Sequence, residues 1–196
     1  MGGHRLITQL GKNKYGGVAI LIHERYADSI ATIREFGERV LAVRIRDNSI
    51  KLTVISVYVP HAGYSVDDLH ELYKKLRKAT AWASSYSSRI IIGGDFNTQL
   101  DVGYRGKLLQ DFANEYKLTI GNEQIGHQWD STWTFYSSLG RKRQIDFILL
   151  GNGMNSLSVA ATNNLCLGSD HRAVQLEISF TELTDDRHHH YRKLPP

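Results

Sequence analysis

Short apolar runs separated by polar turns form the main pattern along the chain, and each run is typical of a β-strand. Residues 17–23 are a continuous apolar run, and in residues 39–45 the apolar side chains at alternate positions share one side of a strand. Residues 51–59 are apolar on both faces, which is expected for a strand inside a sheet covered on both sides. Further strands are predicted at 90–92, 132–136, 144–150 and 174–180.

Two segments have the periodicity of amphipathic helices instead. Ser65 with Asp68 three positions later forms a capping-box pattern, and the residues that follow place one apolar stripe along a helix to about Ala83. A shorter helix is predicted at 108–116. Many strands with few interspersed helices predict an α/β fold with a core of two packed sheets.

Composition and charge agree with one soluble domain. The 196 residues are 41% hydrophobic and 22% charged, and the net charge of +4 weakly favours a polyanionic partner. The single cysteine, Cys166, excludes an internal disulfide, and no apolar run has membrane-spanning length. Residues 181–196 are polar and end in two prolines, so we interpret 1–180 as the domain and 181–196 as a tail or linker. We expect an intracellular protein with no role at a membrane.

Polar side chains follow two of the predicted strands. Asp95 and Asn97 come after the strand at 90–92, and Asp170 and His171 precede the last strand. Oxygen ligands for a hard cation together with an imidazole are the groups that metal-assisted phosphoester cleavage requires. Each pair also has an ordinary explanation, because Asp-x-Asn after two glycines is a common turn and isolated Asp-His pairs are frequent.

The ordered set of such segments is more specific than any one of them. It comprises Gly17-Val18-Ala19-Ile20-Leu21-Ile22, Tyr58-Val59-Pro60-His61-Ala62-Gly63, Gly94-Asp95-Phe96-Asn97, Thr132-Trp133, Gln144-Ile145-Asp146-Phe147-Ile148-Leu149 and Ser169-Asp170-His171. This set resembles the endonuclease/exonuclease/phosphatase superfamily, and most closely the endonuclease domain of non-LTR (LINE-type) retrotransposons. The resemblance covers residues 15–180 and implies a four-layer α/β sandwich, in which two packed mixed β-sheets are flanked by helices.

The same resemblance implies a Mg²⁺-dependent endonuclease, with Mn²⁺ as a substitute, that nicks DNA and leaves a 3′-hydroxyl. It implies Asp95 and Asp170 as metal ligands, with Asp95 also holding the attacking water. Asn97 would orient that water, and Tyr58 would donate a hydrogen bond to the phosphate. His171 would stabilise the developing charge. Asp146 completes the catalytic set by orienting the imidazole.

The resemblance also implies DNA as the partner, a reverse transcriptase region after this segment in an intact element, and a nuclear location. Side chains expected to contact DNA are Arg105, Trp133, Arg141, Lys142 and Arg143. A solvated turn is the competing interpretation of the basic run at 141–143, since arginine and lysine are also common on exposed loops.

One departure from the family pattern affects the expected activity. The family carries an Asn and a metal-binding Glu on strands that precede the run at 17–22, but residues 1–16 contain no Asp or Glu. The expectation is therefore a domain that is incomplete at its N-terminus and poorly active. Two alternatives stay open: an inactive DNA-binding or protein-interaction remnant, and a phosphodiesterase or phosphatase of the same fold acting on another phosphoester.

Overall fold

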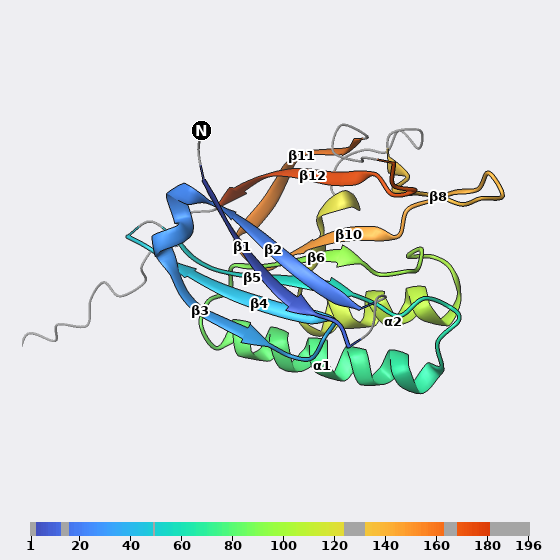
Figure 1. The fold of residues 1–196 in the computed structure, drawn as a ribbon, viewed down its shortest axis with the longest axis horizontal. Coiled ribbons are helices and arrows are strands. Elements are labelled where there is room, and N and C mark those ends of the chain that lie inside the picture. Colours follow the sequence, from blue (N-terminus) through green and yellow to red (C-terminus); the bar gives the residue numbers. More distant parts are fainter. Residues whose placement is uncertain (1–2, 13–15, 49, 124–131, 163–167, 181–196) are drawn as a thin grey trace, which may run out of the picture.

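A six-stranded mixed β-sheet is the centre of the molecule in the computed structural model, which describes residues 3–12, 16–48, 50–123, 132–162 and 168–180 (Figure 1). Its strand order is β3-β4-β5-β6-β10-β7. The neighbours β5 and β6 run parallel, and the other pairs are antiparallel. The strands are β3 (Ile30–Glu35), β4 (Val40–Arg46), β5 (Lys51–Tyr58), β6 (Ile90–Asp95), β7 (Thr119–Ile120) and β10 (Asp146–Leu150).

Both α-helices pack on one face of this sheet (Figure 1). Helix α1 (Val66–Ser84) begins at a complete capping box, in which the Ser65 hydroxyl accepts from the Asp68 amide and the Asp68 carboxylate accepts from the Ser65 amide. Its apolar stripe is buried against the sheet, as is that of α2 (Gly103–Glu115). The largest hydrophobic cluster therefore lies between the helices and the sheet.

Two antiparallel strand pairs cover parts of the opposite face. One consists of β1 (His4–Leu10) and β2 (Gly17–His23), which pack on Leu41, Val43 and Ile45 of β4. The other consists of β11 (Met154–Thr162) and β12 (Ala173–Phe180), and its Met154 packs with Leu150. The short elements are η1 (Glu24–Ser29), η2 (Gly121–Glu123) and the hairpin of β8 (Phe135–Tyr136) with β9 (Lys142–Arg143).

The expected α/β class with packed sheets is confirmed. The predicted strands at 17–23, 39–45, 51–59, 90–92 and 174–180 and both helices are present, with ends shifted by a few residues. In the described part of the chain, no helix is both long and apolar enough to cross a membrane. The tail at 181–196 and Cys166 lie outside the described residues.

Several elements differ from the sequence prediction. Strands β1, β3 and β11 were not predicted, because none has a continuous apolar run; β1 and β3 also expose most of their side chains. The region 132–136 contains only a two-residue strand. Lys142 and Arg143 lie in β9 rather than in a loop, since they pair with β8.

Candidate active site

The candidate site forms where three neighbouring strands of the central sheet end. Tyr58 is the last residue of β5, Asp95 is the last of β6, and Asp146 is the first of β10. The strand register places Asp95 opposite both Tyr58 and Asp146. Residues opposite each other in a sheet share a face, so these three side chains emerge together on the face away from the helices.

Gly94 allows β6 to lie close to β5 at this point. A Cβ atom on Gly94 would lie 1.8 Å from the carbonyl oxygen of Val57, a distance no side chain can adopt. Gly93 is less restricted, because the nearest atom to a Cβ there is 3.8 Å away. The glycine directly before Asp95 is therefore required by packing, and the turn signal in the sequence has a steric cause.

Asn97 holds the Asp95 carboxylate from the loop after β6. Its backbone amide donates to Asp95 Oδ1 over 2.7 Å, and its side-chain Nδ2 donates to Asp95 Oδ2 over 3.0 Å and to the Val59 carbonyl over 2.9 Å. The residue has a φ of 51°, a left-handed conformation that asparagine tolerates better than most residues. Asn97 thus fixes both oxygens of Asp95 and ties them to the end of β5.

His171 completes the cluster from the segment before β12. Its Nδ1 lies 2.9 Å from Asp146 Oδ2, and its ring lies 5.0 Å from that of Phe135 between the centroids. An isolated β-bridge joins Phe135 and His171, which ties this segment to the β8 strand. Ligand atoms of Asp95, Asp146 and His171 all lie within 4.8 Å of one another.

The electrostatics of the cluster follow from burial and from the carboxylate pair. Burial is the main cause that raises the pKa of Asp95 to about 6, and the neighbouring Asp146 carboxylate adds to it. The hydrogen bond with Asp146 is the main cause that raises the pKa of His171. Two facing carboxylates with an imidazole alongside are a donor set that suits a hard divalent cation, which would relieve their repulsion.

Two buried polar side chains position Asp146 from behind. The hydroxyl of Thr134, which is 0% exposed, accepts from the amides of Ile145 over 3.0 Å and Asp146 over 3.1 Å. Asn122, which is 1% exposed, donates to the Asp146 carbonyl over 3.1 Å and accepts from the Ile148 amide over 2.9 Å. Sequence reasoning assigned neither residue a role; Thr134 lies in a segment that it singled out, whereas Asn122 lies in none.

Asp170, expected as a metal ligand, and Arg105, expected to contact DNA, lie in other surroundings than the three clustered residues. Asp170 is exposed and lies outside the group of three, although its charge helps to raise the pKa of the adjacent His171. Arg105 donates to the carbonyl oxygens of Pro60 over 2.6 Å and His61 over 3.0 Å. Its guanidinium therefore holds the loop after β5.

Other residues expected to contact DNA lie beside the cluster. The Trp133 ring is flanked by Arg172, at 4.3 Å from its centroid, and by Lys142, at 5.2 Å. The Arg172 amide also donates to the Thr134 carbonyl over 2.7 Å, which links Trp133 to the segment that carries His171. Arg141 and Arg143 are exposed on the β8–β9 hairpin.

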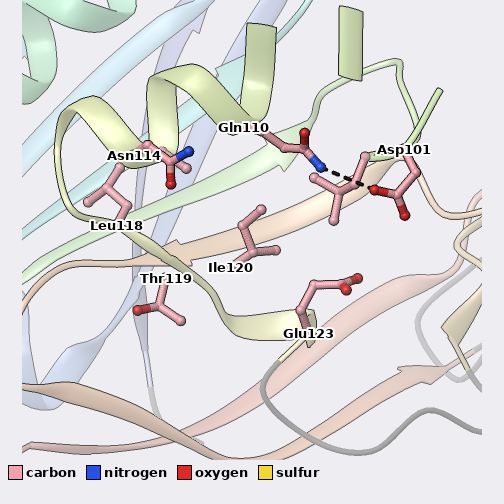
Figure 2. Close-up of a pocket in the computed structure, with 9 residues that line it drawn as sticks. Asp101, Gln110, Asn114, Leu118, Thr119, Ile120 and Glu123 are labelled. Carbon is pink, nitrogen blue, oxygen red and sulfur yellow. Dashed lines mark hydrogen bonds between the residues drawn. The ribbon is translucent and has the colours of Figure 1, made fainter. Parts of the chain in front are cut away.

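A hollow of the described surface lies away from these residues. It measures about 510 Å³ and lies between α2, β7 and η2, where Asp101 accepts from Gln110 over 3.2 Å (Figure 2). None of the predicted site residues lines it. The candidate site lies instead at the ends of the strands, where the side chains of Asp146 and His171 are partly exposed.

Comparisons with known proteins bear on the family and the fold of the chain. The sequence model described as the Endonuclease/Exonuclease/phosphatase family matches residues 3–171. Comparison by sequence with curated proteins gave no match.

Solved structures with the same fold include nucleases and phosphatases. The 3′ phosphatase NExo from Neisseria, bound to a product DNA hairpin, has a TM-score of 0.68 at 16% identity, covering 91% of this chain and 80% of its own. The endonuclease domain of TRAS1, a telomere-specific non-LTR retrotransposon, has a TM-score of 0.61 at 15% identity, covering 89% and 76%. A mannosyl-6-phosphatase from Bacteroides thetaiotaomicron has a TM-score of 0.67 at 14% identity, covering 91% and 78%.

Proposed function

The chain belongs to the endonuclease/exonuclease/phosphatase family, and we propose that it is a divalent-cation-dependent DNA endonuclease of the non-LTR retrotransposon type. The reaction is hydrolysis of one phosphodiester, which nicks DNA and leaves a 3′-hydroxyl. The observation that carries the proposal is the convergence of Asp95, Asp146 and His171 within 4.8 Å at the ends of the strands, flanked by Trp133 and basic side chains.

The donor set fits Mg²⁺ or Mn²⁺. Asp95 and Asp146 would hold the ion. The exposed Asp170, which precedes His171 in the chain, would be a further ligand. Carboxylate oxygens are the ligands that these hard cations prefer. When bound, such an ion supplies Lewis-acid stabilisation of charge on the phosphate.

Asp95 is the group we assign to the attacking water. A carboxylate with a pKa of about 6 is ionised at neutral pH and is a better proton acceptor than an exposed aspartate. Asn97 has both side-chain N–H groups engaged, by Asp95 and by the Val59 carbonyl. Its role is therefore to orient Asp95, and its amide oxygen is the atom left to meet the water or the phosphate.

His171 is the group we assign to the non-bridging phosphate oxygen. Its Nδ1 is engaged by Asp146, so Nε2 is the nitrogen that can donate to substrate. The raised pKa of His171 favours the protonated imidazole, whose charge offsets the negative charge that develops on the phosphate. Tyr58, opposite Asp95 in the sheet, is assigned a second hydrogen bond to the phosphate.

Affinity for DNA is assigned to the aromatic and basic side chains beside the cluster. Trp133 offers a ring for stacking, while Arg141, Lys142 and Arg143 offer charge to phosphates without reading sequence. Arg105 acts indirectly, since it fixes the loop after β5. The reverse transcriptase partner and the nuclear location stay predictions from the sequence resemblance.

A nicking assay tests the proposal. Supercoiled plasmid with 5 mM Mg²⁺ is expected to give open circles whose nicks support primer extension by a polymerase, which requires a 3′-hydroxyl. Asp95→Asn and His171→Ala are each expected to lower the rate by roughly 10²- to 10⁴-fold. Metal-independent DNA binding with no nicking by the wild-type protein would contradict the proposal and support the inactive DNA-binding alternative.

A phosphomonoesterase is the second candidate, because two of the similar structures are phosphatases. Release of inorganic phosphate from a 3′-phosphorylated oligonucleotide, compared with nicking of the same sequence carrying a 3′-hydroxyl, separates the two activities. Phosphate release without internal cleavage would favour the phosphatase.

A further inference from the structure

Cationic and aromatic side chains alternate along a surface distant from the candidate site. The guanidinium of Arg44 lies 3.6 Å from the Trp82 ring centroid and 4.7 Å from that of Tyr86. On the two sides, the Arg34 guanidinium lies 5.8 Å from the Trp82 centroid and the Lys51 ammonium lies 4.8 Å from that of Tyr86. We call these five residues the cation–aromatic ladder.

The ladder lies toward the end of the sheet opposite the candidate site. Arg44 pairs with Thr53 in β4 and β5, and Lys51 is the first residue of β5, whereas Tyr58 at its other end faces Asp95. Lys51 and Tyr58 are seven steps apart along the strand, which is roughly 23 Å at 3.3 Å per step. In Figure 1 the C-terminal end of α1, which precedes Tyr86, is at the left, and the ends of β5 and β6 that carry the site point to the right.

The charges of the ladder have no acidic partner in the described chain. None of the ion pairs between described residues involves Arg34, Arg44 or Lys51. The pKa of Arg44 is lowered mainly by burial and further by the neighbouring Arg34 charge. An anion at this surface would relieve the repulsion between the two guanidinium groups.

Arg44 is fixed by its neighbours, while the outer cations are available. Its Nη2 donates to the Trp82 carbonyl and, over 3.2 Å, to the Ser85 hydroxyl at the end of α1. Arg34 and Lys51 are exposed, and the two aromatic rings are only partly buried. The surface therefore combines exposed cations for phosphates with partly exposed aromatic rings for bases.

We propose that the cation–aromatic ladder binds a single strand of nucleic acid, as a second contact surface separate from the catalytic edge. Alternating charge and aromatic rings match the alternation of phosphates and bases along a strand. A membrane surface is the weaker match, because the ladder has no long apolar side chain to insert among lipids. The proposal adds a binding surface to the proposed endonuclease and does not depend on cleavage.

Fluorescence anisotropy with a labelled 30-nucleotide oligothymidine, in EDTA, tests this surface apart from catalysis. The double variant Arg34→Gln with Lys51→Gln is expected to bind about 10-fold more weakly at 50 mM salt. Its salt dependence should fall by roughly 1.4 in log–log slope, since each phosphate contact on a single strand contributes about 0.7. The matched control, Lys107→Gln with Lys117→Gln, removes the same charge from exposed positions elsewhere and should change affinity less than 2-fold.

Equal weakening in both double variants would overturn the proposal, because it would reflect net charge alone. Unchanged binding in the Arg34/Lys51 variant would overturn it as well. The surface would be assigned to membranes instead if the Arg34/Lys51 variant lost more affinity for vesicles with 30% phosphatidylserine than for the oligonucleotide. Failure of the endonuclease proposal has a different signature, because it would leave oligonucleotide binding intact and abolish only nicking.

Discussion

Replacing Asp95 with asparagine should stabilise the metal-free protein at neutral pH while it abolishes hydrolysis. Burial, followed by the nearby Asp146 carboxylate, raises the pKa of Asp95 from 3.8 to about 6. The ionised form is therefore disfavoured in the folded protein relative to the unfolded chain. An uncharged isostere removes this penalty.

The size of the effect follows from the shift and from the hydrogen bonds that are lost. A rise of roughly two pKa units corresponds to about 3 kcal/mol at pH 7.5, an upper bound because the group is partly exposed. Asn97 donates to both carboxylate oxygens of Asp95. Asparagine at position 95 replaces one of these acceptors by a donor, and the loss of that hydrogen bond costs on the order of 1–2 kcal/mol. The net gain in the free energy of unfolding should be about 1 kcal/mol.

The pH dependence of this gain has a defined sign. A carboxyl whose folded pKa is raised stabilises the fold fully below its unfolded pKa, near 3.8, and loses that contribution as pH rises through its folded value near 6. The difference between variant and wild type should therefore be largest above pH 6. At pH 4 only the hydrogen-bond loss remains, so the variant should then be less stable than the wild type.

Urea unfolding in EDTA at pH 4 and pH 7.5 measures both values, with exposed Asp111→Asn as the control expected to change neither by more than about 0.5 kcal/mol. Adding Mg²⁺ should stabilise the wild type, by the linkage of binding to folding, and the variant much less. A gain that is the same at both pH values, or absent at pH 7.5, would refute the reasoning.

Three further substitutions test the surroundings of the site. Asp146→Asn should lower the pKa of His171, so the alkaline decline in the pH–rate profile at saturating metal should begin at lower pH, and an unmoved profile would argue against the pairing. Thr134→Val should cost about 2–4 kcal/mol in urea unfolding, because two buried amides lose their acceptor, whereas Thr134→Ser should cost under about 1.5 kcal/mol. Gly94→Ala should cost more than about 3 kcal/mol in thermal unfolding, while Gly93→Ala costs under about 1 kcal/mol, and equal effects would exclude the predicted clash.

The buried strands and the long helix were predictable because their physical signals are local. The two-sided apolar pattern of β5 follows from burial, and the capping box of α1 is readable as Ser65 and Asp68. The apolar run of β2 also predicted a strand, although only Ile20 and Ile22 are buried and Leu21 is exposed. Strand β1 gives no such signal, since most of its side chains are exposed and its pairing with β2 holds it in the fold. Strand β11 is similar, because its partner β12 supplies the backbone hydrogen bonds. Whether these segments form strands depends on their pairing with another segment, which cannot be read from the sequence of one segment alone.

The same distinction applies to the site. The local pattern and the family resemblance singled out Asp95, Asn97, Asp146 and His171, all of which lie in one cluster. Only sheet order reveals that Asp146 lies opposite Asp95, because β10 is beside β6 while 51 positions in the chain separate the two aspartates. Two side chains hydrogen-bond to the backbone of Asp146: the Thr134 hydroxyl accepts from its amide, and the Asn122 side chain donates to its carbonyl. These contacts likewise become visible only when the two segments are folded against β10.

This arrangement has a consequence for how the site tolerates change. Asp146 contacts His171 through Oδ2 and lies opposite Asp95, so one side chain connects the two groups to which we assign the proton donor and the attacking water. Effects of substituting Asp95 and His171 should consequently be non-additive, because each changes the field that acts on Asp146. Asn97 enters this coupling only through Asp95, because it contacts Asp95 alone among the three charged groups, so its non-additivity with His171 should be smaller than that of Asp95.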